Sequence, residues 1–320
     1  MRTLSTIFGS GVAMRNALYD RGMLKVRRMA RPVVSIGNIS VGGSGKTPFV
    51  IALGELLKER GVAFDVLSRG YGRKSAQTAV VDPQGSPEQF GDEPLLIARK
   101  LAVPVVVGAD RYQAGLFAEK KFGSKLHLLD DGFQHRRLHR DFDIVMVPAA
   151  DLRDILLPVG RLREPPLSLH RADAVVMPAE ASEEDVAIAR KCMKLQEYLW
   201  RVRREFEVGQ PAGKTVAFCG IARPSQFLSQ LKEANINVAS TVIFSDHHHY
   251  SERDIERLLK TRAESGADSF VTTEKDEVNL GKLRERLRPL QVARLRLVLE
   301  QDVVGSTILK TLEERCGCRF

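Results

Sequence analysis

Cysteine is scarce in this sequence, which has four cysteines in 320 residues, all in the second half. Four cysteines placed in this way cannot cross-link the whole chain as disulfides, so we expect a reducing compartment. Cys316 and Cys318 flank one glycine close to the end, with no histidine or second cysteine pair near them. This spacing does not supply the four ligands of a structural zinc site.

Long hydrophobic runs are also missing, because no window reaches the roughly 18 unbroken apolar residues that a membrane-spanning helix needs. Aromatic residues make up only 6%, and no nucleic-acid-binding motif accompanies the basic residues, so we expect no nucleic-acid partner. Hydrophobic residues make up 43% and no segment is of low complexity, which excludes fibrous and disordered classes. The length fits one large domain or two ordinary ones.

Basic residues outnumber acidic ones by 49 to 40, a net charge of +9 that indicates anionic partners. In residues 1–31, basic side chains are accompanied by a single acid, Asp20. Two interpretations of this segment stay open: an amphipathic stretch on an anionic bilayer, or a helix packed on the domain with solvated arginines. The apolar residues at close to helical spacing are Leu4, Ile7, Phe8, Leu18 and Tyr19.

Short apolar strands alternate with helical stretches through the first 180 residues, which predicts an α/β fold with a mostly parallel sheet flanked by helices. One helical stretch runs from Pro48 to Arg60 and is followed by Gly61, a residue common just after a helix. The expected strands are Val33–Ile36, Phe64–Leu67, Val103–Val107, Leu126–Leu129, Phe142–Val147 and Ala174–Met177.

A second, smaller α/β unit is expected after a charged, helix-prone stretch from Ala181 to Gln210 and the break at residues 211–213. We place the boundary near 180–212 and assign residues 1–200 to a first domain and 201–320 to a second. The expected strands of the second unit are Thr215–Cys219, Val238–Phe244, Ser269–Thr272 and Gln291–Leu299.

The strongest local motif runs from Ser40 to Thr47, between an expected strand and an expected helix. It matches the phosphate loop (P-loop) of P-loop NTPases, except that Ser40 stands where the pattern has its first glycine. A glycine-rich turn that merely precedes a lysine is the alternative. In a phosphate loop, Lys46 would reach the β- and γ-phosphates and Thr47 would bind Mg²⁺. The loop backbone that would surround the phosphates is that of Gly42, Gly43, Ser44 and Gly45.

Two adjacent carboxylates, Asp130 and Asp131, follow the expected strand Leu126–Leu129. Magnesium takes few protein oxygens and keeps much of its water, so this pair is a candidate Mg²⁺ site beside a phosphate loop. Capping or turn formation would also account for the two residues.

A kinase additionally needs a group that takes the proton from the attacking hydroxyl. Asp92 or Glu93, in front of an expected helix, are candidates, although capping would also explain Asp92. The histidines of the segment Asp246-His247-His248-His249-Tyr250 follow a strand of the second unit. Adjacent residues of an extended segment point to opposite faces and cannot share one metal, so we expect one functional histidine and two bystanders.

Several motifs, taken together and in order over nearly the whole chain, make the sequence resemble the tetraacyldisaccharide 4'-kinase family, the lipid A 4'-kinases of Gram-negative envelope synthesis. Ser40 is compatible with this resemblance, while Ser245 and His249 replace commoner prolines. The motifs are Ser35-Ile36-Gly37-Asn38, Val41–Pro48, Leu67–Tyr71, Gly91-Asp92-Glu93-Pro94, Leu129–His135, Leu162–Pro165, Phe244–His247 and Thr272–Asp276.

The resemblance implies transfer of the γ-phosphate of ATP, with Mg²⁺, to the 4'-hydroxyl of tetraacyldisaccharide 1-phosphate, giving lipid IVA. It implies a peripheral protein at the cytoplasmic face of the inner membrane, which contacts an anionic surface through its basic N-terminal segment. The implied partners are therefore ATP, the acylated glucosamine disaccharide 1-phosphate and that membrane.

The resemblance also implies roles for individual residues. Asp92 would act as base together with His247, which the second domain would bring to the site when the domains close. Lys46 would stabilise the transferred phosphate. The remaining site residues would be Arg111 and Gln134 at the nucleotide, and Thr47, Glu93, Asp130 and Asp131 near Mg²⁺.

Two other functions fit part of the same evidence. A nucleotide-dependent switch would use the phosphate loop and Asp130 equally well, but leaves Asp92, His247 and the basic N-terminus unexplained. A kinase of a soluble metabolite would use the same chemistry on a different acceptor.

Overall fold

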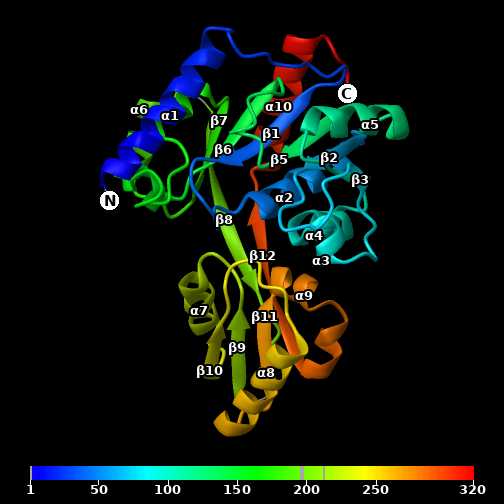
Figure 1. Ribbon diagram of the computed structural model, residues 1–320, viewed down its shortest axis with the longest axis vertical. Helices are drawn as coiled ribbons and strands as arrows, with labels where there is room; N and C mark the ends of the chain where they lie inside the picture. Colours follow the sequence, from blue (N-terminus) through cyan, green and yellow to red (C-terminus); the bar gives the residue numbers. More distant parts are fainter. Residues whose placement is uncertain (1, 195–197, 212) are drawn as a thin grey trace.

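The chain folds into two α/β units that lie end to end and are joined by two long strands (Figure 1). It is described by a computed structural model that covers residues 2–194, 198–211 and 213–320, so Ala212 of the expected break lies outside the described residues. The first unit contains β1 (Val33–Asn38), β2 (Phe64–Ser68), β3 (Ala79–Val80), β4 (Val105–Val107), β5 (Leu126–Asp130), β6 (Phe142–Met146) and β7 (Ala174–Pro178).

These strands are ordered β7-β6-β1-β5-β2-β4-β3, and β3 alone among them runs antiparallel to its neighbour. The register pairs Ile36 of β1 with Asp130 of β5. The segment after β1 and the carboxylates that end β5 therefore emerge side by side at the carboxyl edge of the sheet, where ligands of parallel α/β folds bind.

Helices cover both faces of this sheet because successive strand residues point to opposite sides. Val34 and Ile36 face a core shared with α2 and α10, whereas Val145 and Val175 face a core shared with α6. The helices packed with the first unit are α1 (Arg2–Asp20), α2 (Lys46–Glu59), α3 (Pro87–Phe90), α4 (Asp92–Leu101), α5 (Arg111–Phe122), α6 (Glu183–Cys192) and α10 (Gln301–Cys316), with the 3₁₀ turns η1 (Ala149–Arg153) and η2 (Pro166–Arg171).

The second unit repeats this layering on a smaller scale. Val216 and Phe218 face a core with one helix layer, and Ala217 and Cys219 face the opposite core. Its strands are β9 (Thr215–Cys219), β10 (Val238–Ile243) and β11 (Ser269–Thr273). Its helices are α7 (Pro224–Glu233), α8 (Glu252–Ser265) and α9 (Glu274–Leu280), with the 3₁₀ turn η3 (Gly281–Leu287).

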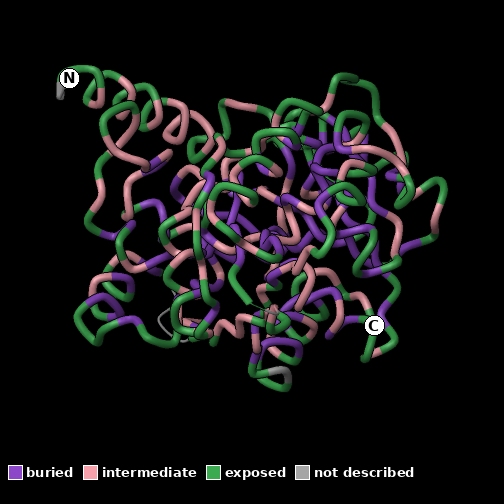
Figure 2. The backbone as a smooth tube through the Cα atoms, turned by 90° about the horizontal axis from the view of Figure 1, so that it is seen from below, coloured by how far each residue is buried: buried purple, intermediate pink, exposed green. Residues whose placement is uncertain are grey.

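Two antiparallel strands, β8 (Leu199–Glu207) and β12 (Leu290–Val298), connect the units. β8 pairs with β7 of the first unit and β12 with β11 of the second, so the described strands form one continuous 12-stranded sheet. Buried residues concentrate toward the interior of the molecule (Figure 2), and separate clusters of them lie in the first unit and in the second. Each unit therefore has its own core, and the linker strands carry fewer buried side chains.

The α/β fold with a mostly parallel sheet is confirmed, and every strand expected from the sequence is present with small differences at its ends. Two features differ. Residues 199–207, inside the stretch expected to be helix-prone, form β8, whereas residues 183–192 are helical. The last helix, α10, packs through Val304, Ile308 and Leu312 into the core of the first unit, so the structure divides the chain differently from a split at residue 200.

Helix α1 packs along the first unit through one face. Ser5 Oγ donates to the carbonyl of Leu156 at 2.9 Å, and Asn16 Nδ2 donates to the buried Glu164 at 2.6 Å. On its other side Ile7 and Met14 are 65% and 66% exposed. One side of α1 is therefore packed on the domain, as one sequence interpretation expected, and the other side exposes apolar residues, as the membrane interpretation expected. No described helix is long and apolar enough to cross a bilayer.

Candidate active site

The phosphate loop curls between β1 and α2 in a conformation that needs its glycines. Gly42, Gly43 and Gly45 have φ angles of 65°, 55° and 91°, values that residues with side chains rarely adopt. Gly45 immediately precedes α2, so the positive end of this helix opens onto the loop. The loop therefore presents backbone N–H groups and a helix terminus to an anion.

Lys46 begins α2 and faces the carboxylates that follow β5. Its Nζ lies 3.4 Å from Asp131 Oδ1, and Arg163 Nη1 lies 3.0 Å from Asp131 Oδ2. Burial alone would raise the pKa of Asp131, but the charges of Lys46 and Arg163 lower it to about 2. Asp131 is therefore ionised at neutral pH, and it holds two cations at the mouth of the loop.

Asp130, the last residue of β5, is buried and has a different environment. Ser68 Oγ donates to its Oδ2 at 3.0 Å, and its Oδ1 has no partner among the described residues. Burial, together with the charges of Glu93 and Asp131, raises the pKa of Asp130 to about 7. A cation between these carboxylates would offset the cost of burying the Asp130 charge and would reduce its repulsion from Glu93 and Asp131.

Magnesium fits this arrangement. The described part of the chain contains no group of three or more His, Cys, Asp and Glu side chains placed to hold a metal. Mg²⁺ does not need one, since it is usually bound through one or two carboxylates, water and the phosphates of the substrate. Asp130, with its unpartnered oxygen, and Thr47 in the first turn of α2 are the residues suited to hold it.

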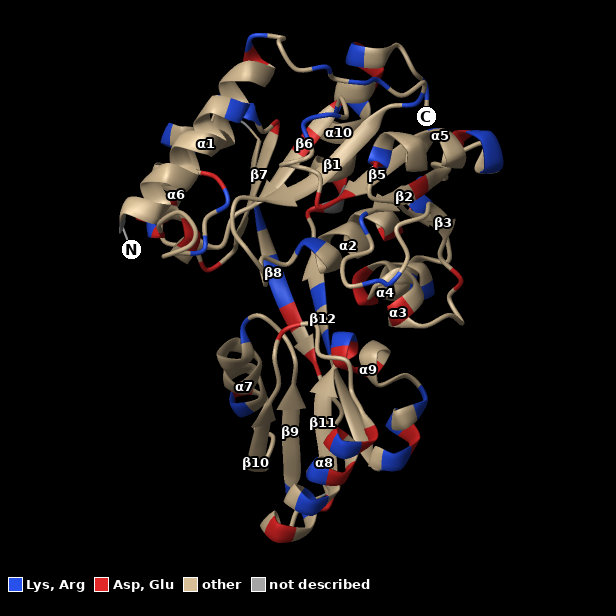
Figure 3. Cartoon of the chain, in the orientation of Figure 1, with Lys and Arg blue, Asp and Glu red and all other residues tan. Residues whose placement is uncertain are grey.

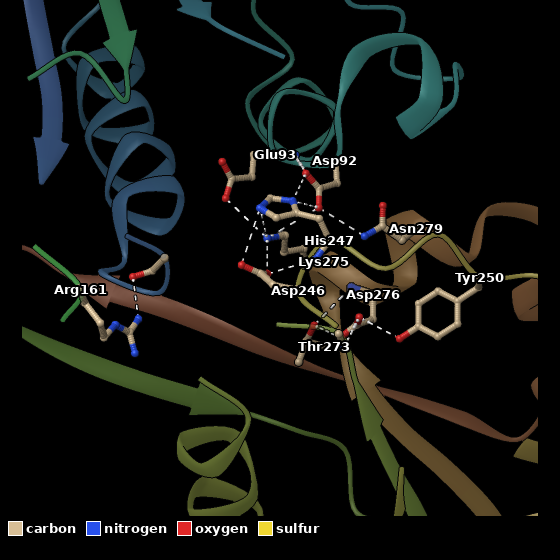
Figure 4. A network of polar contacts seen from close by, with 12 residues as sticks. Asp92, Glu93, Arg161, Asp246, His247, Tyr250, Thr273, Lys275, Asp276 and Asn279 are labelled. Carbon is tan, nitrogen blue, oxygen red and sulfur yellow. Dashed lines mark hydrogen bonds and ion pairs between the residues drawn. The ribbon is translucent and has the colours of Figure 1, made fainter. Parts of the chain in front are cut away.

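Asp92 and His247 meet across the two units. His247 Nδ1 lies 2.9 Å from Asp92 Oδ2, although the two residues are 155 positions apart (Figure 4). Asn279 Nδ2 donates to the same carboxylate oxygen at 3.2 Å, and the backbone N–H of Glu93 donates to Asp92 Oδ1 at 2.8 Å. Asp92 is thus buried and hydrogen-bonded from both units.

This pairing changes both pKa values. Burial alone would raise the pKa of Asp92, but the hydrogen bond from His247 and the charge of Lys275 outweigh burial and lower it to about 2. Burial alone would lower the pKa of His247, but the hydrogen bond to Asp92 raises it. The carboxylate is held ionised, and the imidazole becomes the stronger base of the two.

Lys275 is a site residue to which the sequence analysis gave no role. Its Nζ lies 3.2 Å from His247 Nε2, 3.3 Å from Asp246, and 3.7 Å from each of Asp92 and Glu93 (Figure 4). An ammonium group only donates, so we assign the lone pair of His247 to Nε2 and its proton to Nδ1. The position of Lys275 next to the carboxyl end of β11, in the motif Thr272–Asp276, was the available signal.

Gln134 and Arg111 lie around the same carboxylates. Gln134 accepts a hydrogen bond from Arg163 at 3.3 Å and donates to the carbonyl of Asn38. Arg111 begins α5 and is buried, and its pKa is lowered by burial and by the charge of Arg69. Its Nε has no partner in the described part of the chain.

The other two histidines of the segment are not placed at Asp92. His248 stacks on Phe244 and lies 3.1 Å from Asp254, at the start of α8. Among the described residues, the His249 ring forms no hydrogen bond, ion pair or ring contact. His247 is the histidine that reaches the first unit, which it does from a backbone position with φ 57°.

Comparison with known proteins places this geometry in a family. Residues 1–313 match the family described as tetraacyldisaccharide-1-P 4'-kinase. This chain belongs to that family. Named relatives include the tetraacyldisaccharide 4'-kinase of Koribacter versatilis, 48% identical over 99% of this chain and 100% of that protein. The corresponding protein of Geobacter metallireducens is 40% identical over 97% of this chain and 96% of its own length.

A solved structure agrees with the fold as a whole. LpxK from Aquifex aeolicus, crystallised in complex with ATP, superposes with a TM-score of 0.75, shares 34% identity and covers 97% of both chains. The family resemblance drawn from the motifs is therefore confirmed. In this tetraacyldisaccharide-1-P 4'-kinase, the phosphate loop, the carboxylates after β5 and the Asp92–His247 pair lie within one site.

Proposed function

We propose that this chain transfers the γ-phosphate of ATP to the 4'-hydroxyl of tetraacyldisaccharide 1-phosphate, in the synthesis of lipid A. The observation that carries this proposal is the meeting of Asp92 and His247 beside the phosphate loop. A methyl group added at Gly42 would lie 3.8 Å from Asp246, the neighbour of His247, so the loop carrying the histidine packs against the loop for phosphate. A kinase needs these two groups together.

Lys46 and the loop N–H groups would hold the β- and γ-phosphates, and Thr47, Glu93, Asp130 and Asp131 are the residues that would hold Mg²⁺. When bound, Mg²⁺ neutralises charge that develops on the triphosphate. Gln134 and Arg111 complete the polar wall of the nucleotide site. These roles rest on the arrangement of buried, oppositely charged groups around Lys46 and Asp131.

Asp92 and His247 act as one base. The ionised Asp92 accepts the Nδ1–H of His247, which raises the basicity of the imidazole and fixes its orientation. The hydroxyl proton passes to this pair as the oxygen attacks the γ-phosphorus. Lys275 donates to His247 Nε2 in this structure, so the acceptor hydroxyl takes the place of that donor.

The acceptor is a lipid, and α1 carries the surface that suits it. The side of α1 that faces away from the first unit exposes Leu4, Ile7 and Met14. Basic residues follow the helix directly, among them the exposed Arg21 and Lys25. An apolar stripe beside basic side chains favours the surface of an anionic bilayer, here the cytoplasmic face of the inner membrane, with the protein bound peripherally.

The test measures ATP consumption with and without detergent-dispersed acyl-disaccharide 1-phosphate. A lipid kinase consumes ATP only with this acceptor and forms a doubly phosphorylated product that mass spectrometry detects. A nucleotide switch would hydrolyse ATP without dependence on the lipid, and a kinase of a soluble metabolite would leave the lipid unmodified. Either result would contradict the proposal.

A further inference from the structure

The phosphate loop departs from the usual pattern at Ser40, and the structure gives this serine a partner. Ser40 is buried, and its hydroxyl donates to Asp151 Oδ2. Asp151 lies in η1, which follows β6, and is itself buried. A glycine at position 40 could not make this hydrogen bond. Ser40 therefore attaches the start of the loop to a buried carboxylate.

The second oxygen of that carboxylate is bound by the other unit. Arg223 Nη2 lies 3.0 Å from Asp151 Oδ1, with the Arg223 side chain 20% exposed and that of Asp151 2% exposed. Arg223 immediately precedes α7 of the second unit, so this ion pair joins the two units. Ser40, Asp151 and Arg223 thus form a continuous polar connection from the phosphate loop to the second unit.

Arg223 also lies directly against the loop. A methyl group added at Gly43 would be 2.8 Å from Arg223 Cγ and 3.1 Å from its Nε, and one added at Gly42 would be 2.6 Å from Ala222 Cβ. These glycines are needed for the approach of the second unit as well as for their positive φ angles. The Arg223 stem is therefore packed on the part of the loop that surrounds phosphate.

Two arginines at this position keep hydrogen-bond donors without protein partners. Among the described residues, the Nε atoms of Arg223 and of Arg204 on β8 are buried without a hydrogen-bond partner. Arg204 Nη2 lies 3.7 Å from a methyl group added at Gly45, and the positive charge of Arg223 helps to lower the pKa of Arg204, after burial. Figure 3 shows basic residues where β8 and β12 pass between the units. A buried N–H donor without a partner is costly, and an anion that accepts from it removes that cost.

We propose that Arg223 is a nucleotide-contacting residue of the phosphoryl transfer, supplied by the second unit and held on the phosphate loop by Asp151 and Ser40. Its free Nε–H donates to the polyphosphate of ATP, while Nη2 stays on Asp151. A guanidinium placed at transferring phosphate stabilises the charge that develops there. The role of Arg223 in phosphoryl transfer rests on the proposed function. Its binding of ATP does not depend on which acceptor is used.

The experiment compares Arg223→Ala with Arg223→Lys, Asp151→Asn and Ser40→Gly. We expect Arg223→Ala to weaken Mg-ATP binding by roughly tenfold or more in calorimetry, and to lower kcat on the order of 100-fold. AMP, which lacks the contacted phosphates, should bind equally well to Arg223→Ala and the unchanged protein. Arg223→Lys, which keeps the charge, should recover part of both losses.

Asp151→Asn and Ser40→Gly should show smaller losses of the same kind, and the Ser40→Gly/Arg223→Ala double variant should be no weaker in ATP binding than Arg223→Ala. Lys232→Ala removes an exposed charge at the other end of α7 and serves as the matched control, with no change expected. Thermal unfolding identifies any variant that does not fold, and Arg223→Lys then carries the test.

Unchanged ATP affinity and kcat in folded Arg223→Ala would overturn this role, as would equal losses for ATP and AMP. The proposed function fails in a different way. If the unchanged protein binds ATP through Arg223 but does not phosphorylate the acyl-disaccharide, the acceptor assignment is wrong and the Arg223 contact stands.

Discussion

Lys46 is the positively charged residue of the phosphate-loop motif. It faces Asp131, whose second cation is Arg163, so removing Lys46 leaves the carboxylate paired while the transferring phosphate loses its ammonium. We expect Lys46→Ala to lower kcat by about 10²–10³-fold at saturating ATP. Steady-state kinetics measure this, with Lys120→Ala, an exposed lysine of α5, as the control. A near-normal rate would show that the loop does not hold the reacting phosphate.

In the proposed mechanism, Asp92 and His247 set the pH dependence of the reaction. The base must be unprotonated, so activity falls as the pH drops through the pKa of His247, which the hydrogen bond to Asp92 raises. Asp92→Asn removes that carboxylate charge and lowers the pKa, so the acidic limb of the pH–rate profile should move to lower pH while kcat falls by about 10²–10⁴-fold. If the acidic limb of the profile does not move, it reports the titration of a group other than His247.

The same pair should show strongly non-additive kinetics. In the proposed role, Asp92 orients His247 and raises its basicity, so the double variant Asp92→Asn/His247→Ala should be little slower than the slower single variant. Nucleotide binding should remain largely intact in all three, because neither side chain contacts Lys46 or the loop glycines in the described contacts. Multiplied losses would instead indicate two separate roles.

Some residues of the candidate site could be predicted from the sequence and others could not, for physical reasons. Lys46 and Asp130 were found because local motifs place them at strand ends on one sheet edge. The link between Asp92 and His247 came from family resemblance, since nothing local joins residues 155 positions apart. Lys275 and Arg223 received no role because an isolated charge in a sequence is ordinarily a solvated one, and their partners are set by how the units pack.

At the scale of elements, β8 is the strand that the sequence pattern failed to predict. Its residues Trp200 and Val202 are buried and alternate with Arg201 and Arg203, a strand pattern of period two. A linker strand has few neighbours and needs few apolar residues, so β8 carries many charges. Those charges made the stretch resemble an exposed helix. Strands inside the units were predicted well since both of their faces are covered, which requires continuous apolar runs.

Helix α1 is the element that we expect to bind the membrane. Leu4, Ile7 and Met14 form its exposed stripe, so replacing all three with glutamine should weaken co-sedimentation with anionic vesicles without unfolding the protein. The same change should raise KM for the lipid acceptor and leave KM for ATP nearly unchanged. The control replaces Leu116 and Phe117, exposed apolar residues of α5, with glutamine.

Charge contributes to the same binding, but only through side chains that are free to face lipid. Arg15 and Arg28 are engaged with Glu164 and Asp141, whereas Arg21 and Lys25 are exposed. Reversal of Arg21 and Lys25 to glutamate should reduce vesicle binding, by ~1 kcal/mol for each basic charge lost at the surface, and should reduce its salt dependence. Vesicle binding that ignores salt and all of these residues would mean that α1 serves only as a packed helix.

At the scale of the whole molecule, the proposed site takes residues from both units. α4 contributes Asp92 and Glu93, while the second unit contributes Asp246, His247 and Lys275. Among the described residues, Lys275 contacts carboxylates of both units at 3.3 to 3.7 Å, and Lys100 of α4 forms an ion pair with Glu274 of α9 across the same interface. The linker strands β8 and β12 are the covalent connections, so approach of the units depends on such contacts.

Lys275→Met should therefore open the molecule. Lys275 lies between Asp92 and Glu93 of the first unit and Asp246 of the second, and without its ammonium these like charges repel one another with less compensation. We expect small-angle X-ray scattering to show a larger radius of gyration for Lys275→Met than for the control Lys260→Met, an exposed lysine of α8. The difference should shrink in 1 M salt, where the screening length is about 3 Å. An unchanged radius at low salt would show that other contacts hold the units together and that Lys275 acts only on the proton of His247.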